Sequence, residues 1–319
     1  MSNSVLGSDV PSLSKGKSYL QESMVRIRLP AEGKLNIVKL IKVGSTIAAE
    51  CFRYAVTGEK DAYDNAVRTF LAMEKLETVT PIGGFVARSY VSINESTGEG
   101  GEWHVSVDGK WKWKGDTSSD EIVGHMFAYP LFYDLVAEGE MKGRVKGLVD
   151  RLMTHIVDHN FLLIDLDGIP TRWGVWTPDS LNSSKGWMYE KGINSLQILV
   201  FLKSASHITQ NPKYDKAYNF LVREHHYLDN MLVQKMQQIP LDIRNWPMYN
   251  SHRWDIRKSA INDRFFKPQA TKPIPTPERA ISKWNSNTYQ MDGGGDGLSE
   301  DDGAYFLLPY WMARYHELL

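Results

Sequence analysis

The sequence predicts an all-α fold in which helical hairpins close into a ring, with long loops and a small β-hairpin at one end. Helical periodicity of apolar residues dominates the 319 residues, and a helix–turn–helix pattern recurs three times. Strand-like alternation is confined to short pieces such as residues 102–113, where Asp108-Gly109 is expected to form a hairpin turn. We expect one domain over residues 36–319, preceded by an extension, residues 1–35, that is interpreted as the remnant of a longer chain.

Each hairpin can be located by its turn. The predicted hairpins are residues 48–76 with a turn at Thr57-Gly58, residues 132–157 with a turn at Glu138-Gly139, and residues 198–228 with a turn at 209–212. Long links rich in Gly, Trp and Asp follow the hairpins; they are residues 78–117, 161–192 and 242–303. A regular solenoid would have short connections of constant length, so the pattern favours a closed ring. Each link joins the second helix of one hairpin to the first helix of the next, so we expect all three links at one end of the ring.

The hairpin plan from about residue 36 onward resembles the (α/α) toroids, the superfamily of six-hairpin barrels that includes many glycoside hydrolases and polysaccharide lyases. The loop sequences "GDTSSDE", "DGIPTRWGVW" and "EDDGAYFLLPYWMARYH" contribute to the resemblance. It extends to the superfamily and to no single characterised family within it. The resemblance implies an (α/α) toroid of four to six helical pairs and a carbohydrate-active function.

Composition narrows the choice of partners. Lys and Arg total 37 against 38 for Asp and Glu, so net charge gives no reason to expect binding to nucleic acid or to an anionic membrane. Cys51 is the only cysteine, which excludes an internal disulfide and argues against thiolate zinc sites. No run of about 18 apolar residues occurs, so we expect a soluble chain. An export signal that had been removed would leave no trace, so the compartment and the oligomeric state stay open.

Residues 115–121, "GDTSSDE", end the first link and begin a helix. Ser118 and Glu121 fit a capping box. In this motif the Ser118 hydroxyl accepts the backbone N–H of Glu121, and the Glu121 carboxylate accepts the backbone N–H of Ser118. This cap leaves Asp116 and Asp120 unexplained. Paired carboxylates at a ring mouth suit glycoside hydrolysis, so both are candidate catalytic residues.

The second link carries the clearest pattern for ligand binding. Trp173 and Trp176 lie three residues apart in a loop with Gly and Pro, and Arg172 precedes them. Flat indole rings can stack on sugar rings, and Arg can hold a carboxylate or sulfate through two hydrogen bonds. The alternative is that both rings plug the core of the ring. Tyr189 and Asn194 follow as further substrate-binding candidates, whereas Asp165-x-Asp167-Gly168 lacks the other ligand positions of a calcium loop.

The stretch 291–316 repeats the arrangement of an acidic loop followed by an aromatic helix. Glu300, Asp301 and Tyr310 are candidate substrate-binding residues there, and a helix cap with a loop is the alternative. The spacing does not fit an EF-hand, although looser calcium binding stays open.

Arg88, beside Gly83-Gly84, is a candidate substrate clamp or a structural partner for one of the acids. His125 completes the set of substrate-binding candidates. Neither the adjacent histidines at 225 and 226 nor any phosphate-binding fingerprint or nucleophile elbow supports a metal or a cofactor, so we expect none.

We therefore expect a carbohydrate-active enzyme that cleaves a polysaccharide or oligosaccharide, with acidic saccharides among the candidates. Hydrolysis is favoured because carboxylates dominate the predicted mouth. A polysaccharide lyase, with Tyr189, His125 or Tyr310 as base, is one alternative. A toroid that binds a glycan or a protein without catalysis is the other.

Overall fold

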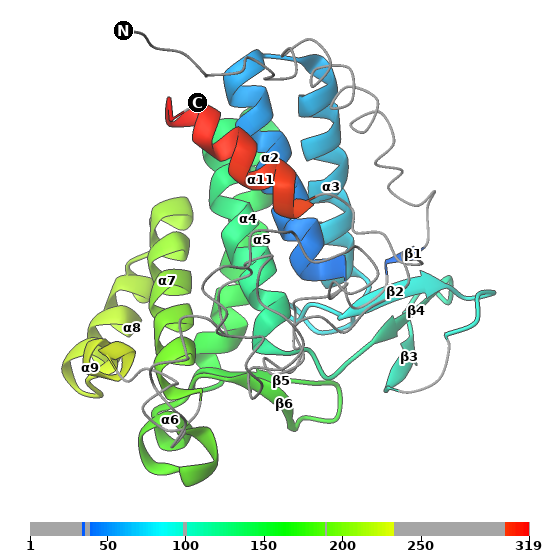
Figure 1. The fold of residues 1–319 in the computed structure, drawn as a ribbon. Coiled ribbons are helices and arrows are strands. Elements are labelled where there is room, and N and C mark those ends of the chain that lie inside the picture. Colours follow the sequence, from blue (N-terminus) through cyan, green and yellow to red (C-terminus); the bar gives the residue numbers. More distant parts are fainter. Residues whose placement is uncertain (1–33, 36–38, 98–100, 189, 233–303, 319) are drawn as a thin grey trace, which may run out of the picture.

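Helices dominate the chain in the computed structural model, which describes residues 34–35, 39–97, 101–188, 190–232 and 304–318 (Figure 1). Three helical hairpins follow one another along the sequence. They are α2 (Lys39–Thr57) with α3 (Lys60–Thr78), α4 (Ser119–Leu135) with α5 (Gly139–Asp158), and α7 (Lys191–Thr209) with α8 (Pro212–Arg223). All three predicted hairpins and their turns are thus confirmed.

Local chemistry explains why the third hairpin turns where it does. Gln210 adopts a left-handed conformation with φ of 58° and ends α7, with its backbone N–H bonded to the carbonyl of Ser206. The side chain of Asn211 then accepts the backbone N–H of Lys213, and Pro212 occupies the first turn of α8, where its missing N–H costs nothing. The four residues therefore stop one helix and start the next.

The long helices pack through α2 and α7. Helix α2 contacts α3, α4 and α11 (Ala304–Tyr315), whereas α7 contacts α4, α5, α8 and α9 (Tyr227–Leu232). Helices α2 and α4 approach so closely that a Cβ on Gly44 would lie 2.5 Å from the carbonyl oxygen of Gly124. One continuous core runs between the hairpins, and its largest fully buried side chains include Trp113, Trp176, Tyr129, Tyr214, Phe70, Phe85 and Phe132.

The sheet content exceeds the single hairpin predicted from the sequence. Strand β3 (Trp103–Val105) does pair with β4 (Trp111–Lys114) across the expected turn, but β2 (Ser89–Ser92) and β1 (Lys34–Leu35) extend them into an antiparallel sheet in the order β1-β2-β4-β3. A second antiparallel pair joins β5 (Leu162–Ile164) to β6 (Pro170–Val175). The fold is therefore mostly helical with small antiparallel sheets, and the all-α expectation is correct only in this coarser sense.

Two of the predicted links do lie at one end of the helices. Link 78–117 carries β2, β3 and β4, and link 161–192 carries β5, β6, the short helix α6 (Pro178–Ser183) and the 3-10 turn η1 (Lys185–Trp187). Figure 1 shows both sheets below the helical layer, at the end opposite the turn between α2 and α3. Link 242–303 lies outside the described residues.

Within the described ranges, no helix is long and apolar enough to cross a membrane.

Candidate functional site

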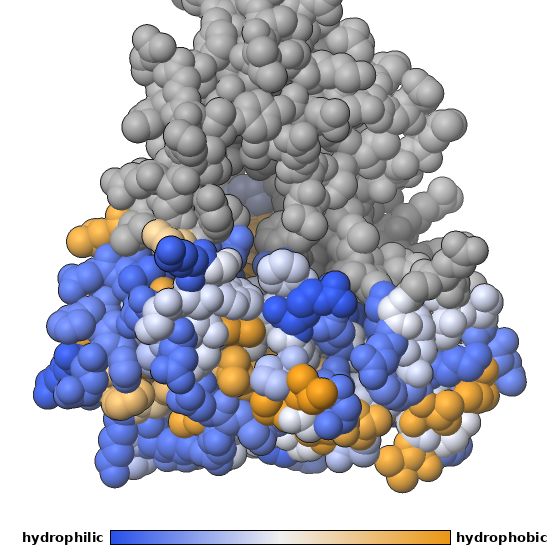
Figure 2. Space-filling view, turned by 90° about the horizontal axis from the view of Figure 1, so that it is seen from below, coloured by the Kyte–Doolittle hydropathy of each residue, from blue (hydrophilic) through white to orange (hydrophobic). Residues whose placement is uncertain are grey.

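A polar pocket of about 510 Å³ opens between the two links. Link 78–117 contributes one wall, and the β5–β6 hairpin contributes the other. The pocket is lined by three cationic side chains, four carboxylates and smaller groups: Arg88, Gly101, Glu102, Lys114, Asp116, Asp165, Asp167, Ile169, Pro170, Thr171 and Arg172. The face of the molecule at this end is largely hydrophilic, with separate hydrophobic patches (Figure 2).

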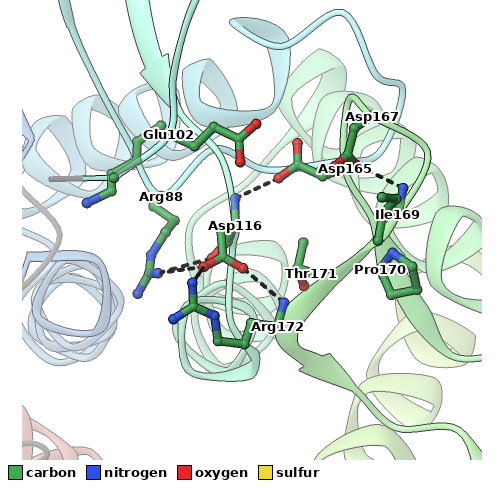
Figure 3. A pocket seen from close by; sticks show the side chains of 11 residues that line it. Arg88, Glu102, Asp116, Asp165, Asp167, Ile169, Pro170, Thr171 and Arg172 are labelled. Carbon is green, nitrogen blue, oxygen red and sulfur yellow. Dashed lines mark hydrogen bonds and ion pairs between the residues drawn. The ribbon is translucent and has the colours of Figure 1, made fainter.

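Asp116 joins the two walls. Its backbone N–H donates to Oδ2 of Asp165 at 2.6 Å, and its own Oδ1 accepts the backbone N–H of Arg172 at 2.9 Å. Asp116 has a φ of 52°, a left-handed conformation that is uncommon for a residue other than glycine. Such a conformation persists where its surroundings fix it, and these two hydrogen bonds across the pocket do so (Figure 3).

Two guanidinium groups face the Asp116 carboxylate (Figure 3). Its Oδ2 lies 3.6 Å from the guanidinium of Arg172 and 4.0 Å from that of Arg88. The side chain keeps about a quarter of its surface exposed, since its exposed fraction is 26%. The Asp116 carboxylate therefore lies beside two cationic side chains at the pocket wall. A carboxylate that acts only as a general acid or base would be expected without such partners.

Arg88 is a structural partner as well as a pocket residue. Its Nε donates to Oε1 of Glu121 at 3.2 Å, and one terminal nitrogen donates to the backbone carbonyl of Asp116 at 3.0 Å. Most of its donors are therefore used within the protein, and its side chain is only 21% exposed. Of the two alternatives for Arg88, the structure supports the partner of an acid more directly than the substrate clamp.

The helix that begins beside the pocket is capped as predicted. Ser118 and Glu121 form a capping box at the start of α4, and a carboxylate oxygen of Glu121 accepts the backbone N–H of Ser118 at 2.7 Å. The hydroxyl of Thr117 donates to the carbonyl of Val86 at 2.6 Å, which ties the cap to the first link. Asp120 lies in the first turn of α4 and is not among the residues that line the pocket.

Lys114 enters the pocket through space that a glycine leaves open. A Cβ on Gly101 would lie 2.1 Å from Cε of Lys114, and Gly101 has a φ of 98° that side chains rarely adopt. Burial, and next the nearby charge of Arg88, lower the pKa of Lys114. Gly115 also leaves space for a neighbouring side chain. A Cβ on Gly115 would lie 2.7 Å from Oδ2 of Asp165.

The two candidate tryptophan platforms differ. Trp173 is 50% exposed and meets Trp187 edge-on, with ring centroids 6.1 Å apart. Trp176 is fully buried, and its indole N–H donates to Oε1 of Gln197 at 2.9 Å. The expectation of an exposed ring face therefore holds for Trp173 and not for Trp176. Trp176 directly follows β6, and its ring is buried in the core, where it packs edge-on against Phe201 of α7.

Two further substrate-binding candidates belong to the interior. His125 is fully buried on α4, where its Nδ1 lies 2.6 Å from the hydroxyl of Tyr129, and burial lowers its pKa to about 3. Asn194 is 2% exposed and donates to the carbonyl of Val175, which fixes the end of β6 to α7. Neither side chain reaches the pocket, so their predicted contact with substrate is not supported by the structure.

The remaining candidates lie elsewhere. Tyr189, Glu300 and Asp301 fall outside the described residues. Tyr310 lies on α11, accepts a hydrogen bond from Arg314 at 3.4 Å, and does not line the pocket. Arg172 does line it, with a side chain that is 72% exposed.

Sequence reasoning missed Lys114, Glu102 and Asp165 as pocket residues. Lys114 ends β4 and Glu102 directly precedes β3, so both belong to the β-hairpin that the sequence predicts. The hairpin sequence alone does not show that these two side chains face the second link. Asp165 belongs to the short acidic turn with Gly168, whose sequence lacks the other ligand positions of a calcium loop. Its carboxylate instead accepts the backbone N–H groups of Asp116 and Leu166. In the part of the chain that the structure describes, no three His, Cys, Asp or Glu side chains gather as metal ligands would.

Comparisons of the chain with models of protein families, with curated proteins and with solved structures found no match.

Proposed function

We propose that this chain is a carbohydrate-active enzyme of (α/α)-toroid fold, and that it binds a saccharide in the pocket between its two links and hydrolyses a glycosidic bond there. The observation that carries the proposal is the double hydrogen bond at Asp116. It joins link 78–117 to link 161–192 across a polar cavity of about 510 Å³, which lies in the range typical of small-molecule sites.

The arrangement of the helices supports the toroid. Helix α2 contacts α11 and α4, and α4 contacts α7, a succession of contacts between first helices that part of a toroid would also have. Helices α3 and α8 pack on their hairpin partners, whereas α5 packs more extensively on α7 than on α4. The position of two links at one end of the helices also fits a toroid.

Hydrolysis requires one carboxylate that stays ionised and one that donates a proton. Asp116 suits the ionised role, because guanidinium groups and a backbone N–H stabilise its negative charge. Glu102 is the proposed proton donor. It lines the same pocket, its side chain is 55% exposed, and its Oε1 lies 3.4 Å from Nε2 of His104.

Trp173 is the proposed platform for a sugar unit outside the pocket. It follows Arg172 on β6 and is not among the residues that line the pocket, and its half-exposed ring contacts Trp187 edge-on. A ring that is already held in place loses little conformational entropy when a sugar stacks on it.

A non-catalytic glycan-binding toroid is the second candidate, and one observation favours it. Each pocket carboxylate already has a partner: Asp116 and Asp165 accept backbone N–H groups across the pocket, Asp167 accepts the N–H of Ile169, and Glu102 faces His104. A lyase is less well supported, because two of its three proposed bases, His125 and Tyr310, do not line the pocket.

The test is a depolymerisation screen over neutral and acidic polysaccharides, with new reducing ends as the readout. We expect cleavage by the natural chain and a loss of several orders of magnitude in Asp116→Asn and in Glu102→Gln. Asp229→Asn is the matched control, because Asp229 is 75% exposed on α9. Saccharide binding without cleavage would favour the second candidate, and an unsaturated product absorbing in the ultraviolet would favour the lyase.

A further inference from the structure

We propose that Asp165 is a positioning residue for the reaction: its carboxylate holds the backbone of Asp116 in the left-handed conformation that directs the Asp116 carboxylate across the pocket. This inference rests on the proposed hydrolysis and adds a residue that the sequence did not single out. Asp165 lies in the turn between β5 and β6, whereas Asp116 belongs to the opposite wall, so the contact between them spans the pocket (Figure 3).

The backbone of Asp116 has a conformation that needs support. Its φ of 52° lies in the left-handed region, which residues with a side chain adopt uncommonly, although Asp and Asn enter it more readily than most. The backbone nitrogen of Asp116 lies 2.6 Å from Oδ2 of Asp165, to which it donates. A hydrogen bond to a carboxylate is among the stronger ones in proteins, so this contact favours the observed conformation.

The backbone conformation in turn decides where the Asp116 carboxylate lies. Its Oδ1 accepts the backbone N–H of Arg172 at 2.9 Å, and its Oδ2 lies 3.6 Å from the guanidinium of the same residue. The common right-handed and extended conformations differ from the observed φ by about 100° or more, so a change to either would redirect the side chain. The carboxylate would then leave the Arg172 N–H. Asp165 therefore acts on the reaction through Asp116.

Asp165 is itself held in place, which a positioning residue requires. Its Oδ1 accepts the backbone N–H of Leu166 at 2.7 Å, its backbone N–H donates to the carbonyl of Ile169 at 3.0 Å, and its carbonyl accepts the N–H of Gly168 at 3.0 Å. The facing chain leaves room for the carboxylate because residue 115 is glycine. The acceptor for the Asp116 N–H therefore has a fixed place in the hairpin.

Asp167 provides a comparison within the same turn. Both acids line the pocket, and each accepts a backbone N–H. The bond of Asp167 runs to Ile169 and stays within its own hairpin, whereas that of Asp165 reaches the opposite wall. Replacing either residue removes one negative charge from the turn, so a difference between the two variants reports the bond across the pocket rather than the charge.

The first measurement is amide hydrogen exchange in the full chain without ligand, followed residue by residue by NMR. Asp165→Ala should speed exchange of the Arg172 amide by roughly 10- to 100-fold, because the Asp116 carboxylate that protects this amide is no longer held in place. Asp167→Ala should leave exchange at Arg172 almost unchanged. Amides in the middle of α5 should change far less than Arg172 in both variants, which separates a local effect from global destabilisation.

The second measurement is steady-state cleavage of the best substrate from the depolymerisation screen. Asp165→Ala should lower kcat by roughly 100-fold, a loss typical of a catalytic group displaced by about 1 Å, and should change KM little. Asp165→Asn keeps one oxygen acceptor and should lose less, and it supplies both measurements if Asp165→Ala does not fold. Asp229→Asn on α9 remains the control that should retain kcat.

Unchanged exchange at Arg172 in the folded Asp165 variants would overturn the inference. So would a kcat equal to that of the natural chain, and so would a rise in KM alone, which would make Asp165 a substrate contact. Each of these results leaves the proposed hydrolysis standing. A natural chain that cleaves no saccharide in the screen would overturn the hydrolysis, and the inference with it.

Discussion

Trp173 and Trp176 lie three residues apart and occupy opposite environments. Trp176→Ala should cost about 3–5 kcal/mol of unfolding free energy, because it empties a fully buried site and removes the partner of Gln197. Trp173→Ala should cost about 1 kcal/mol or less, because half of that side chain faces solvent. Denaturation by urea, followed by circular dichroism, measures both. Equal destabilisation by the two substitutions would show that Trp173 is also a core residue.

Buried histidines should make the protein sensitive to acid. Burial lowers the pKa of His125 from 6.5 to about 3 and that of His155 from 6.5 to about 4. The unfolded chain therefore takes up protons below pH 6.5 that the folded chain does not accept until the pH is far lower. The unfolding free energy should fall as the pH drops from 6.5 toward 3, and it should be insensitive to these groups above pH 6.5.

The test compares the slope of unfolding free energy against pH in three chains. Replacing the pair His125→Phe and Tyr129→Phe should reduce the slope between pH 4 and 6.5, because it removes the buried titrating ring without leaving its hydroxyl partner unpaired. His226→Asn, at an exposed residue with a left-handed φ of 56°, should leave the slope almost unchanged. An unchanged slope in the double variant would show that His125 is accessible to protons in the folded state.

At the scale of the elements, the contact between α2 and α4 depends on two glycines. Gly44→Ala should destabilise the fold by roughly 1–3 kcal/mol, although alanine favours helices, because the new Cβ would lie 2.5 Å from the carbonyl oxygen of Gly124. Gly143→Ala is the matched control within α5, where a Cβ meets nothing within 4 Å, and it should stabilise by about 0.5–1 kcal/mol. Thermal unfolding that ranks the two variants in the opposite order would contradict this packing.

The helical hairpins could be predicted from the sequence because the residue types within each turn predict where one helix ends and the next begins. Gly58 and Gly139 have the positive φ that glycine tolerates, and Asn211 and Pro212 cap and begin α8, whereas the left-handed φ of Gln210 is not a conformation that its residue type predicts. The strands were harder to predict, because β2 is four residues long and β5 three, and short apolar runs do not distinguish a strand from a loop. The order of the strands in the larger sheet, β1-β2-β4-β3, also depends on pairing between segments that are far apart in the sequence.

At the scale of the whole molecule, the prediction that the links share one end holds for links 78–117 and 161–192, and the polar pocket lies between them. The prediction does not identify the residues that line the pocket. Asp116 and Arg172 line the pocket, whereas Trp176, which follows β6 in the second link, is buried in the core. Which way a side chain points from a short strand depends on register, and a one-residue difference in register exchanges the buried and exposed faces. The contact of Asp165 with Asp116, 49 positions apart, has no local signature.

The central claim is that one pocket, walled by both links, binds the saccharide. Hydrogen–deuterium exchange with and without the best substrate or tightest-binding saccharide from the depolymerisation screen tests it most directly. We predict slower exchange in residues 111–116 and in residues 170–175 together, because a ligand between the two walls steadies the hydrogen bonds that join them at Asp116. The turns at the opposite end of the hairpins, such as residues 57–60, should exchange as before. Protection confined to those turns, or to one wall alone, would contradict the account.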